Sequence, residues 1–186
     1  MEASPTTSVV GRQFCNPHTV DLTVTKNAAS CFFKDVGGGF TTPMGCPSSP
    51  CEGRLQYTWE VFRGDSMNAK NLLFTARRSS LLPQLKLEID IFLAGSTVQK
   101  NARDFRIKCS CLSRSCTLYI ANSGTPIAQI NRKFSGLSDW VFGGGKFSVA
   151  VFPHVDYVFV MALVVILDKI ARDIRGGAMI MIELDF

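Results

Sequence analysis

The sequence predicts a mainly β protein: an antiparallel β-barrel with one central, buried hydrophobic helix near the C-terminus. Two observations lead to this prediction. Many short segments alternate between apolar and polar residues, and turn-forming residues separate them, which is typical of consecutive antiparallel strands. One stretch, 157–167, is apolar at every position. With 186 residues, 46% of them hydrophobic and 19% charged, the chain is large and apolar enough for one globular domain.

The apolar stretch is predicted to be a helix because it is long and has a helix signal at each end. Asp156 is a good N-cap, and Gly176-Gly177 is a stop signal. The residues predicted to form the core of this helix are Tyr157, Phe159, Met161, Leu163, Val164 and Leu167.

A helix that is apolar on all sides must be enclosed, and three enclosures are open: the barrel interior, a membrane, or a partner protein. We favour the barrel interior. The apolar run is shorter than the roughly 20 residues of a membrane span. Asp168-Lys169 follows it directly, which also disfavours a membrane hairpin or anchor.

The strands are predicted from period-two alternation and from the turns between them. In residues 85–93, for example, Leu87, Ile89 and Ile91 share one face of the strand, and charged residues occupy the other. The predicted strands are 21–26, 57–62, 71–77, 85–93, 104–111, 116–121, 126–133 and 146–152, with 30–36 and 178–184 as two further candidates.

Two regions do not follow this pattern. Residues 1–20 are rich in turn formers and are expected to form a loose leader, with Val9, Val10 and Phe14 as the residues most suited to contact the body. The single domain is expected to span 21–186. Within it, residues 37–55 are saturated with Gly, Pro, Ser and Cys, so we expect an irregular, disordered segment.

No arrangement typical of an enzyme, a metal site or a cofactor site is found in the sequence. The two histidines, His18 and His154, are far apart, and His154 is interpreted as a turn residue. The cysteines at 46, 51, 109, 111 and 116 do not have the spacing of a zinc knuckle. Gly143-Gly-Gly-Lys146 lacks the phosphate-loop pattern and is interpreted as a hairpin turn.

The cysteines and the first residues favour a cytoplasmic protein, with a nuclear location left open. Seven cysteines at irregular spacing are typical of reduced thiols and not of a disulfide framework. The first eight residues are polar and lack the apolar core of a secretory signal.

The basic residues are the remaining functional signal, in a chain with a formal net charge of +5. Four of them are candidates for holding the phosphates of anionic lipid headgroups: Arg77, Arg78, Arg106 and Lys108. Arg106 and Lys108 alternate with apolar residues and are therefore expected on the outer face of one strand. An ordinary solvated face is the alternative interpretation. No nucleic-acid partner is expected.

Several blocks of the sequence resemble the plant LURP-one-related family. The blocks are 59–66 (WEVFRGDS), 72–80 (LLFTARRSS), 104–108 (DFRIK), 115–119 (SCTLY), 147–157 (FSVAVFPHVDY) and 162–168 (ALVVILD). This resemblance implies a tubby-like fold, a closed antiparallel barrel around a central hydrophobic helix, and a link to plant defence. The family has further strands before its Trp-Glu block, so about two early strands are expected to be missing here. The family pattern has Asn at the position of His154.

Two functions follow as alternatives. The first is a non-enzymatic binding module that touches anionic phospholipid peripherally, at the plasma membrane. The second is a protein-interaction module that recruits a partner at an open barrel edge, which the missing strands would leave. Membrane insertion of the helix is the least favoured alternative.

Overall fold

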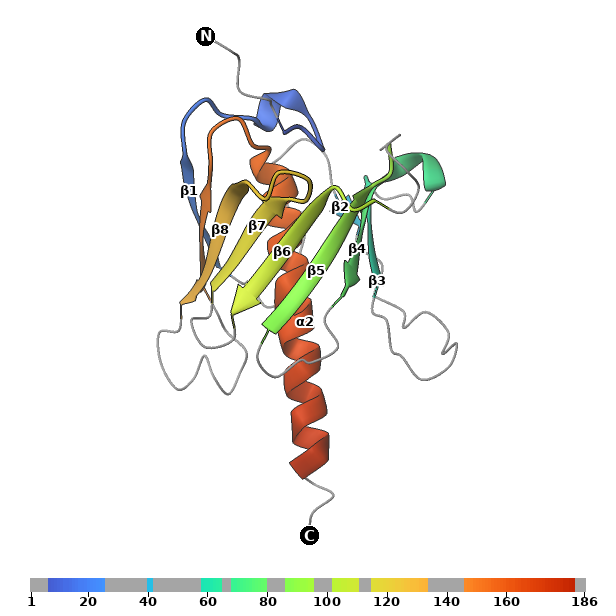
Figure 1. Cartoon of the computed structure of the whole chain (residues 1–186). Coiled ribbons are helices and arrows are strands. Elements are labelled where there is room, and N and C mark those ends of the chain that lie inside the picture. The colour runs from blue at the N-terminus through green and yellow to red at the C-terminus, as the bar shows by residue number, and fades with distance from the viewer. Residues whose placement is uncertain are drawn as a thin grey trace.

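The fold is a strongly curved antiparallel sheet that surrounds one long helix (Figure 1). The structure is a computed structural model, and it describes residues 7–25, 40–41, 58–64, 68–79, 86–95, 102–110, 115–133 and 146–182. The strands are β1 (Val20–Thr25), β2 (Phe40–Thr41), β3 (Thr58–Arg63), β4 (Leu72–Arg78), β5 (Lys86–Leu93), β6 (Phe105–Ser110), β7 (Ser115–Ile120), β8 (Pro126–Lys133) and β9 (Lys146–Val151). The helix is α2 (Tyr157–Ile182), and two short 3-10 turns are η1 (Arg12–Phe14) and η2 (Ala69–Asn71).

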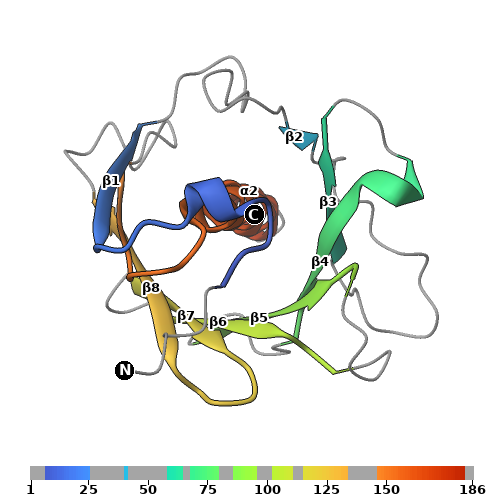
Figure 2. The same ribbon diagram turned by 90° about the horizontal axis from the view of Figure 1, so that it is seen from above.

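The described strands form one sheet in the order β1-β9-β8-β7-β6-β5-β4-β3-β2. Consecutive strands from β2 to β9 are neighbours, and β1 pairs with β9. Viewed along the helix, the sheet curves around it, with β1 and β2 at its two ends (Figure 2). Among the described strands β1 and β2 do not pair with each other, so these strands do not form a closed barrel.

Eight strands lie where the alternating segments predict them, with bounds that differ by at most one residue at either end. The alternation of apolar and polar residues along each strand determines which side chains are buried. In β6, for example, Phe105 and Ile107 are buried, while Lys108 between Ile107 and Cys109 is exposed. The short β2 lies within residues 37–55, where no strand was predicted. The candidate strand 30–36 lies outside the described residues.

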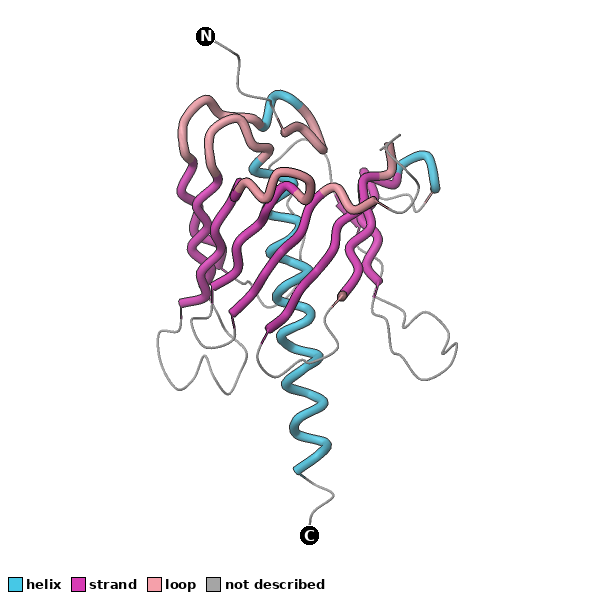
Figure 3. Tube along the Cα trace, viewed as in Figure 1, coloured by secondary structure: helices cyan, strands magenta, loops and turns pink. Residues whose placement is uncertain are grey.

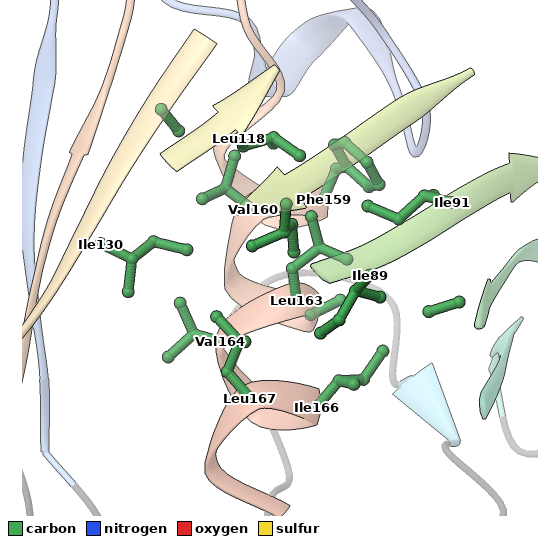
Figure 4. Close-up of a cluster of buried hydrophobic side chains, with 14 of the residues drawn as sticks. Ile89, Ile91, Leu118, Ile130, Phe159, Val160, Leu163, Val164, Ile166 and Leu167 are labelled. Atoms are coloured by element: carbon green, nitrogen blue, oxygen red, sulfur yellow. The ribbon is translucent and has the colours of Figure 1, made fainter. Parts of the chain in front are cut away.

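The helix runs through the space that the curved sheet encloses, as predicted (Figure 3). Side chains from the inner face of the sheet, such as Ile89, Ile91 and Leu118, point toward it (Figure 4). Phe159 is fully buried and makes edge-on and tilted ring contacts, each 5.2 Å between centroids, with Phe74 and Phe105. Burial of this apolar surface is the main favourable contribution to folding.

Four of the six predicted helix core residues, Phe159, Leu163, Val164 and Leu167, are buried. The other two, Tyr157 and Met161, are half-buried, and so is Val165. These three residues recur every four positions and therefore form one stripe along the helix. Over residues 157–170 the helix is thus enclosed on most of its circumference, and one stripe is only partly covered.

The predicted end of the helix is wrong. The helix continues through Gly176-Gly177 to Ile182, and residues 178–182 belong to it instead of to a last strand. Glycine inside a helix costs only about 1 kcal/mol relative to alanine. The residues around the pair, Ala171, Arg172, Ala178 and Met179, are good helix formers, so the glycines do not terminate the helix.

The described part of the leader, from Thr7 onward, is held against the body by Asp156. The Asp156 side chain is fully buried. Its Oδ2 accepts hydrogen bonds from the backbone N–H groups of Val9, Val10 and Gly11, at 3.2, 2.7 and 3.1 Å. Its Oδ1 caps the helix by accepting from the N–H groups of Val158 and Phe159, at 3.0 and 3.1 Å.

Further contacts strengthen this attachment. Arg63 donates from Nη2 to the carbonyl of Val10 at 2.6 Å, and Phe14 packs edge-on against Tyr157 with ring centroids 5.7 Å apart. Val10 is buried in the core. Because the two oxygens of the Asp156 carboxylate accept from different segments, this one side chain joins the leader to the start of α2.

Candidate functional site: the outer face of β4 to β7

The candidate headgroup residues do not share one face of the sheet. In β4 the residues Phe74 and Ala76 point inward and are buried, so Arg78 has the same inward orientation and Arg77 points outward. The Nε of Arg78 is buried, and no hydrogen-bond partner for it lies among the described residues. Arg77 is exposed and lies over the ring of Phe92, with its guanidinium carbon 5.4 Å from the ring centroid. Of this adjacent pair, only Arg77 is presented on the outer face.

The outer face alternates basic and acidic residues across the strands. Arg77 of β4 lies opposite Asp90 of β5, which lies opposite Arg106 of β6. In the next outward-facing row, Glu88 lies opposite Lys108. Opposite charges at directly opposed positions stabilise a sheet, so part of this basic cluster has a structural role.

Arg106 is the most strongly paired of the basic residues. Its Nε donates to Asp90 Oδ1 at 2.8 Å, and its Nη1 lies 3.5 Å from Glu88 Oε2. The hydrogen bond to Asp90, followed by the charges of Asp90 and Glu88, raises the pKa of Arg106, although partial burial opposes the rise. Arg106 therefore bridges β6 to the two carboxylates on β5.

The other outer-face cations are more exposed to solvent. Lys108 is exposed, with its Nζ 5.5 Å from the centroid of the Tyr119 ring. The Arg103 side chain is 45% exposed and lies 3.8 Å from Asp90. The named residues of this face, Arg77, Arg103, Arg106 and Lys108 with Asp90 and Glu88, carry a summed formal charge of +2. We name Arg77, Arg103 and Lys108, with Phe92 and Tyr119 beneath two of them, the basic face.

A second arginine faces the interior. Arg132 of β8 lies over Phe147, 5.5 Å from the ring centroid, and its Nη2 is 4.0 Å from Oδ1 of Asp168 on the helix. Asp168 is only 8% exposed. The residue that ends the apolar run in the sequence is thus placed inside the fold, opposite an inward-facing cation.

The cysteine arrangement differs from the prediction of reduced thiols. Cys109 and Cys116, which lie opposite each other on β6 and β7, are joined by a disulfide. Cys15 is a free thiol, and its burial, followed by the charge of Asp156, raises its pKa. The sequence alone did not predict the bond, because it depends on the register between two strands.

Both histidines bond through their backbones to Asn16, and the N–H of His154 donates to the Asn16 carbonyl oxygen at 2.7 Å. His18 is exposed, and its backbone N–H donates to the side chain of Asn16 at 3.0 Å. His154 has φ of +63°, a left-handed conformation that suits its predicted place in a turn. In the described part of the chain, no three His, Cys, Asp or Glu side chains gather as metal ligands would.

Of the helices in the described ranges, none combines the length and the apolar character that are needed to cross a bilayer.

The comparisons with known proteins agree with the fold. The chain is 46% identical over 119 residues to protein LURP-one-related 15 and 41% identical over 119 residues to protein LURP-one-related 10, both from Arabidopsis thaliana. These matches cover 64% of this chain but only 54% and 60% of the relatives, so the matched part is little more than half of their length. An X-ray structure of an Arabidopsis thaliana protein superposes with a TM-score of 0.55 at 28% identity, covering 88% of this chain and 98% of the other.

The family itself is identified by a match over most of the chain. The LURP-one-related family model matches residues 47–168, which include β3 to β9 and α2 as far as Asp168. The chain therefore belongs to the LURP-one-related family.

Proposed function

We propose that this chain is a non-enzymatic binding module that docks peripherally on anionic phospholipid, in the cytoplasm at the plasma membrane, as a regulator in plant defence. The observation that carries the proposal is the basic face. It presents Arg77, Arg103 and Lys108 to solvent on one side of the sheet. The link to defence rests only on the family name.

The ion pairs on this face indicate different roles for its basic residues. Arg106 is paired with Asp90 and Glu88, so it holds the strands together and contributes little attraction to an anionic surface. Arg77 and Lys108 each lie over an aromatic ring, which orients the cation and leaves it exposed. A cation near an anionic membrane contributes about 1 kcal/mol, so binding should be weak and sensitive to salt.

The proposal includes a tubby-like fold in which the sheet closes around the helix. The curvature of the described sheet and the position of α2 inside it support this arrangement (Figure 2). The resemblance of the sequence to the family supports it as well.

The test is flotation of purified protein with liposomes that contain phosphatidylserine. The double variant Arg77→Gln/Lys108→Gln removes two exposed cations from the basic face. At about 1 kcal/mol per charge, its partitioning should fall by roughly 30-fold. The matched control, Arg12→Gln/Lys70→Gln, removes two exposed cations that lie in η1 and η2 and should lose far less. Equal losses in both variants would show that only net charge matters, which contradicts a defined face.

A second candidate function is recruitment of a protein partner at the sheet edge. The described strands leave β1 and β2 without pairing to each other, and the stripe of Tyr157, Met161 and Val165 is only partly covered. A sheet edge can accept a strand from a partner. Behaviour as a monomer that retains no partner on affinity purification from plant extract would count against this function.

A further inference from the structure

We propose that Cys109 and Cys116 form a reversible thiol–disulfide site, which exchanges with small-molecule disulfides of the glutathione class. The proposal does not depend on lipid binding. It rests on the register of β6 and β7, the position of the two sulfurs, and the difference in exposure between the two residues.

The sheet itself holds the two cysteines together. Cys109 and Cys116 are direct partners in the antiparallel ladder, with pairs on both sides of them, Lys108 with Thr117 and Ser110 with Ser115. Their Cα atoms are 4.0 Å apart. Since backbone hydrogen bonds maintain the ladder, the two thiols stay adjacent after the bond is reduced. A thiol so close to its partner closes a mixed disulfide as an intramolecular step, which is favoured by a high effective concentration.

Both redox states suit the surroundings of the pair. Cys109 is 8% exposed and belongs to the hydrophobic core, and Cys116 packs against that core. A reduced cysteine behaves as a small apolar residue, so reduction leaves no charged or strongly polar group buried. The two residues are separated by only 7 positions, so the bond constrains a short loop, and constraints on short loops stabilise a fold less than those on long ones.

The exposure of the two residues sets the order of the reaction. Cys116 is half-buried, whereas Cys109 is buried, so the Cys116 thiolate is the group that a solution disulfide can reach. It attacks oxidised glutathione, forms a mixed disulfide and releases one glutathione thiolate. The Cys109 thiolate then attacks the Cys116 sulfur and releases the second glutathione. Two electrons pass from the cysteine pair to oxidised glutathione, and the two thiol protons go to the released glutathione thiolates.

The experiment measures the redox state of the folded, purified chain in buffers with stepped ratios of reduced to oxidised glutathione. After an acid quench, alkylation and peptide mass spectrometry report which cysteines are bonded, and circular dichroism reports the fold. We expect the Cys109–Cys116 bond to pass from nearly complete to nearly absent across the series while the sheet signal is retained. A bond that persists in the most reducing buffer, one that never forms, or one that joins either residue to a different cysteine would overturn the proposal.

Two single variants test the order of attack. Cys109→Ser should accumulate glutathione on Cys116, because the resolving thiol is gone. In Cys116→Ser, the buried Cys109 should be modified at least about tenfold more slowly. Cys15, which is free and pairs with Asp156 just before α2, is the internal reference and should react alike in both variants. Equal modification rates of Cys109 and Cys116 would contradict the assigned order, and the wild-type series decides reversibility even if a variant fails to fold.

Discussion

At the scale of single residues, Asp156 joins parts of the chain that are far apart in sequence. Its two carboxylate oxygens receive five backbone N–H groups, three from the leader and two from the first turn of α2. A backbone N–H group that is buried without an acceptor lowers stability. The Asp156 carboxylate supplies the acceptors that let the leader and the first turn of α2 pack together. Arg63 adds a bond from β3 to the same segment.

The two roles of Asp156 can be separated by substitution. Asp156→Ser keeps a good N-cap but cannot reach the leader, so it should lower the free energy of unfolding by about 1–3 kcal/mol. Asp156→Ala loses the cap as well and should cost roughly 1 kcal/mol more. Urea unfolding measures the loss, and hydrogen exchange locates it. Residues 9–11 should lose protection in both variants, and Val158 and Phe159 only in the alanine variant. Unchanged protection of residues 9–11 would contradict this account.

Other residue-scale features were readable from the sequence only in part. Asp156 was predicted as an N-cap, but its contacts with the leader were missed because they join residues more than 140 positions apart. The opposed faces of Arg77 and Arg78 follow from period-two alternation, so the sequence did hold that signal. The pairing of Arg106 with Asp90 requires the strand register, which alternation alone does not determine.

At the scale of elements, the helix and the sheet depend on each other. α2 has too few polar residues in its first three turns to be stable in water alone, and the inner face of the sheet is equally apolar. Phe159 is central to their contact because it meets rings from β4 and β6. The strands and the helix start were predictable because both patterns are strongly periodic. The helix end was not, because a glycine pair is a weak stop when helix formers flank it.

Because residues 157–170 of α2 are buried except along one stripe, a buried and a half-buried residue of the helix can be compared by substitution. Phe159→Ala should lower the free energy of unfolding by about 3–5 kcal/mol, because it leaves a cavity between α2 and the sheet. Met161→Ala, two positions away on the half-buried stripe, should cost much less because solvent already reaches that side. Chemical denaturation gives the free energy of unfolding of each variant, and the two values can be compared if both variants show the same dependence on denaturant concentration. Similar losses would show that the helix is not placed as described.

At the scale of the whole molecule, a curved sheet encloses the apolar start of α2 and carries the basic face on its outer side. The mainly β class and the single helix were predictable from the sequence because local alternation determines both. The described strands leave the sheet open between β1 and β2. Of residues 26–57, where the sequence has little periodicity, the structure describes only β2. Which basic residues are exposed and which are paired depends on the register of the strands, so the sequence did not predict it.

The central claim, peripheral binding to anionic phospholipid, is tested most directly by flotation of the unmodified protein with liposomes of graded phosphatidylserine content at low and at physiological salt. A face with a formal charge of +2 should give partitioning that rises with anionic content and falls several-fold as salt increases. Binding that ignores both variables, or no binding from a well-folded sample, would contradict the claim and favour recruitment of a protein partner at the sheet edge.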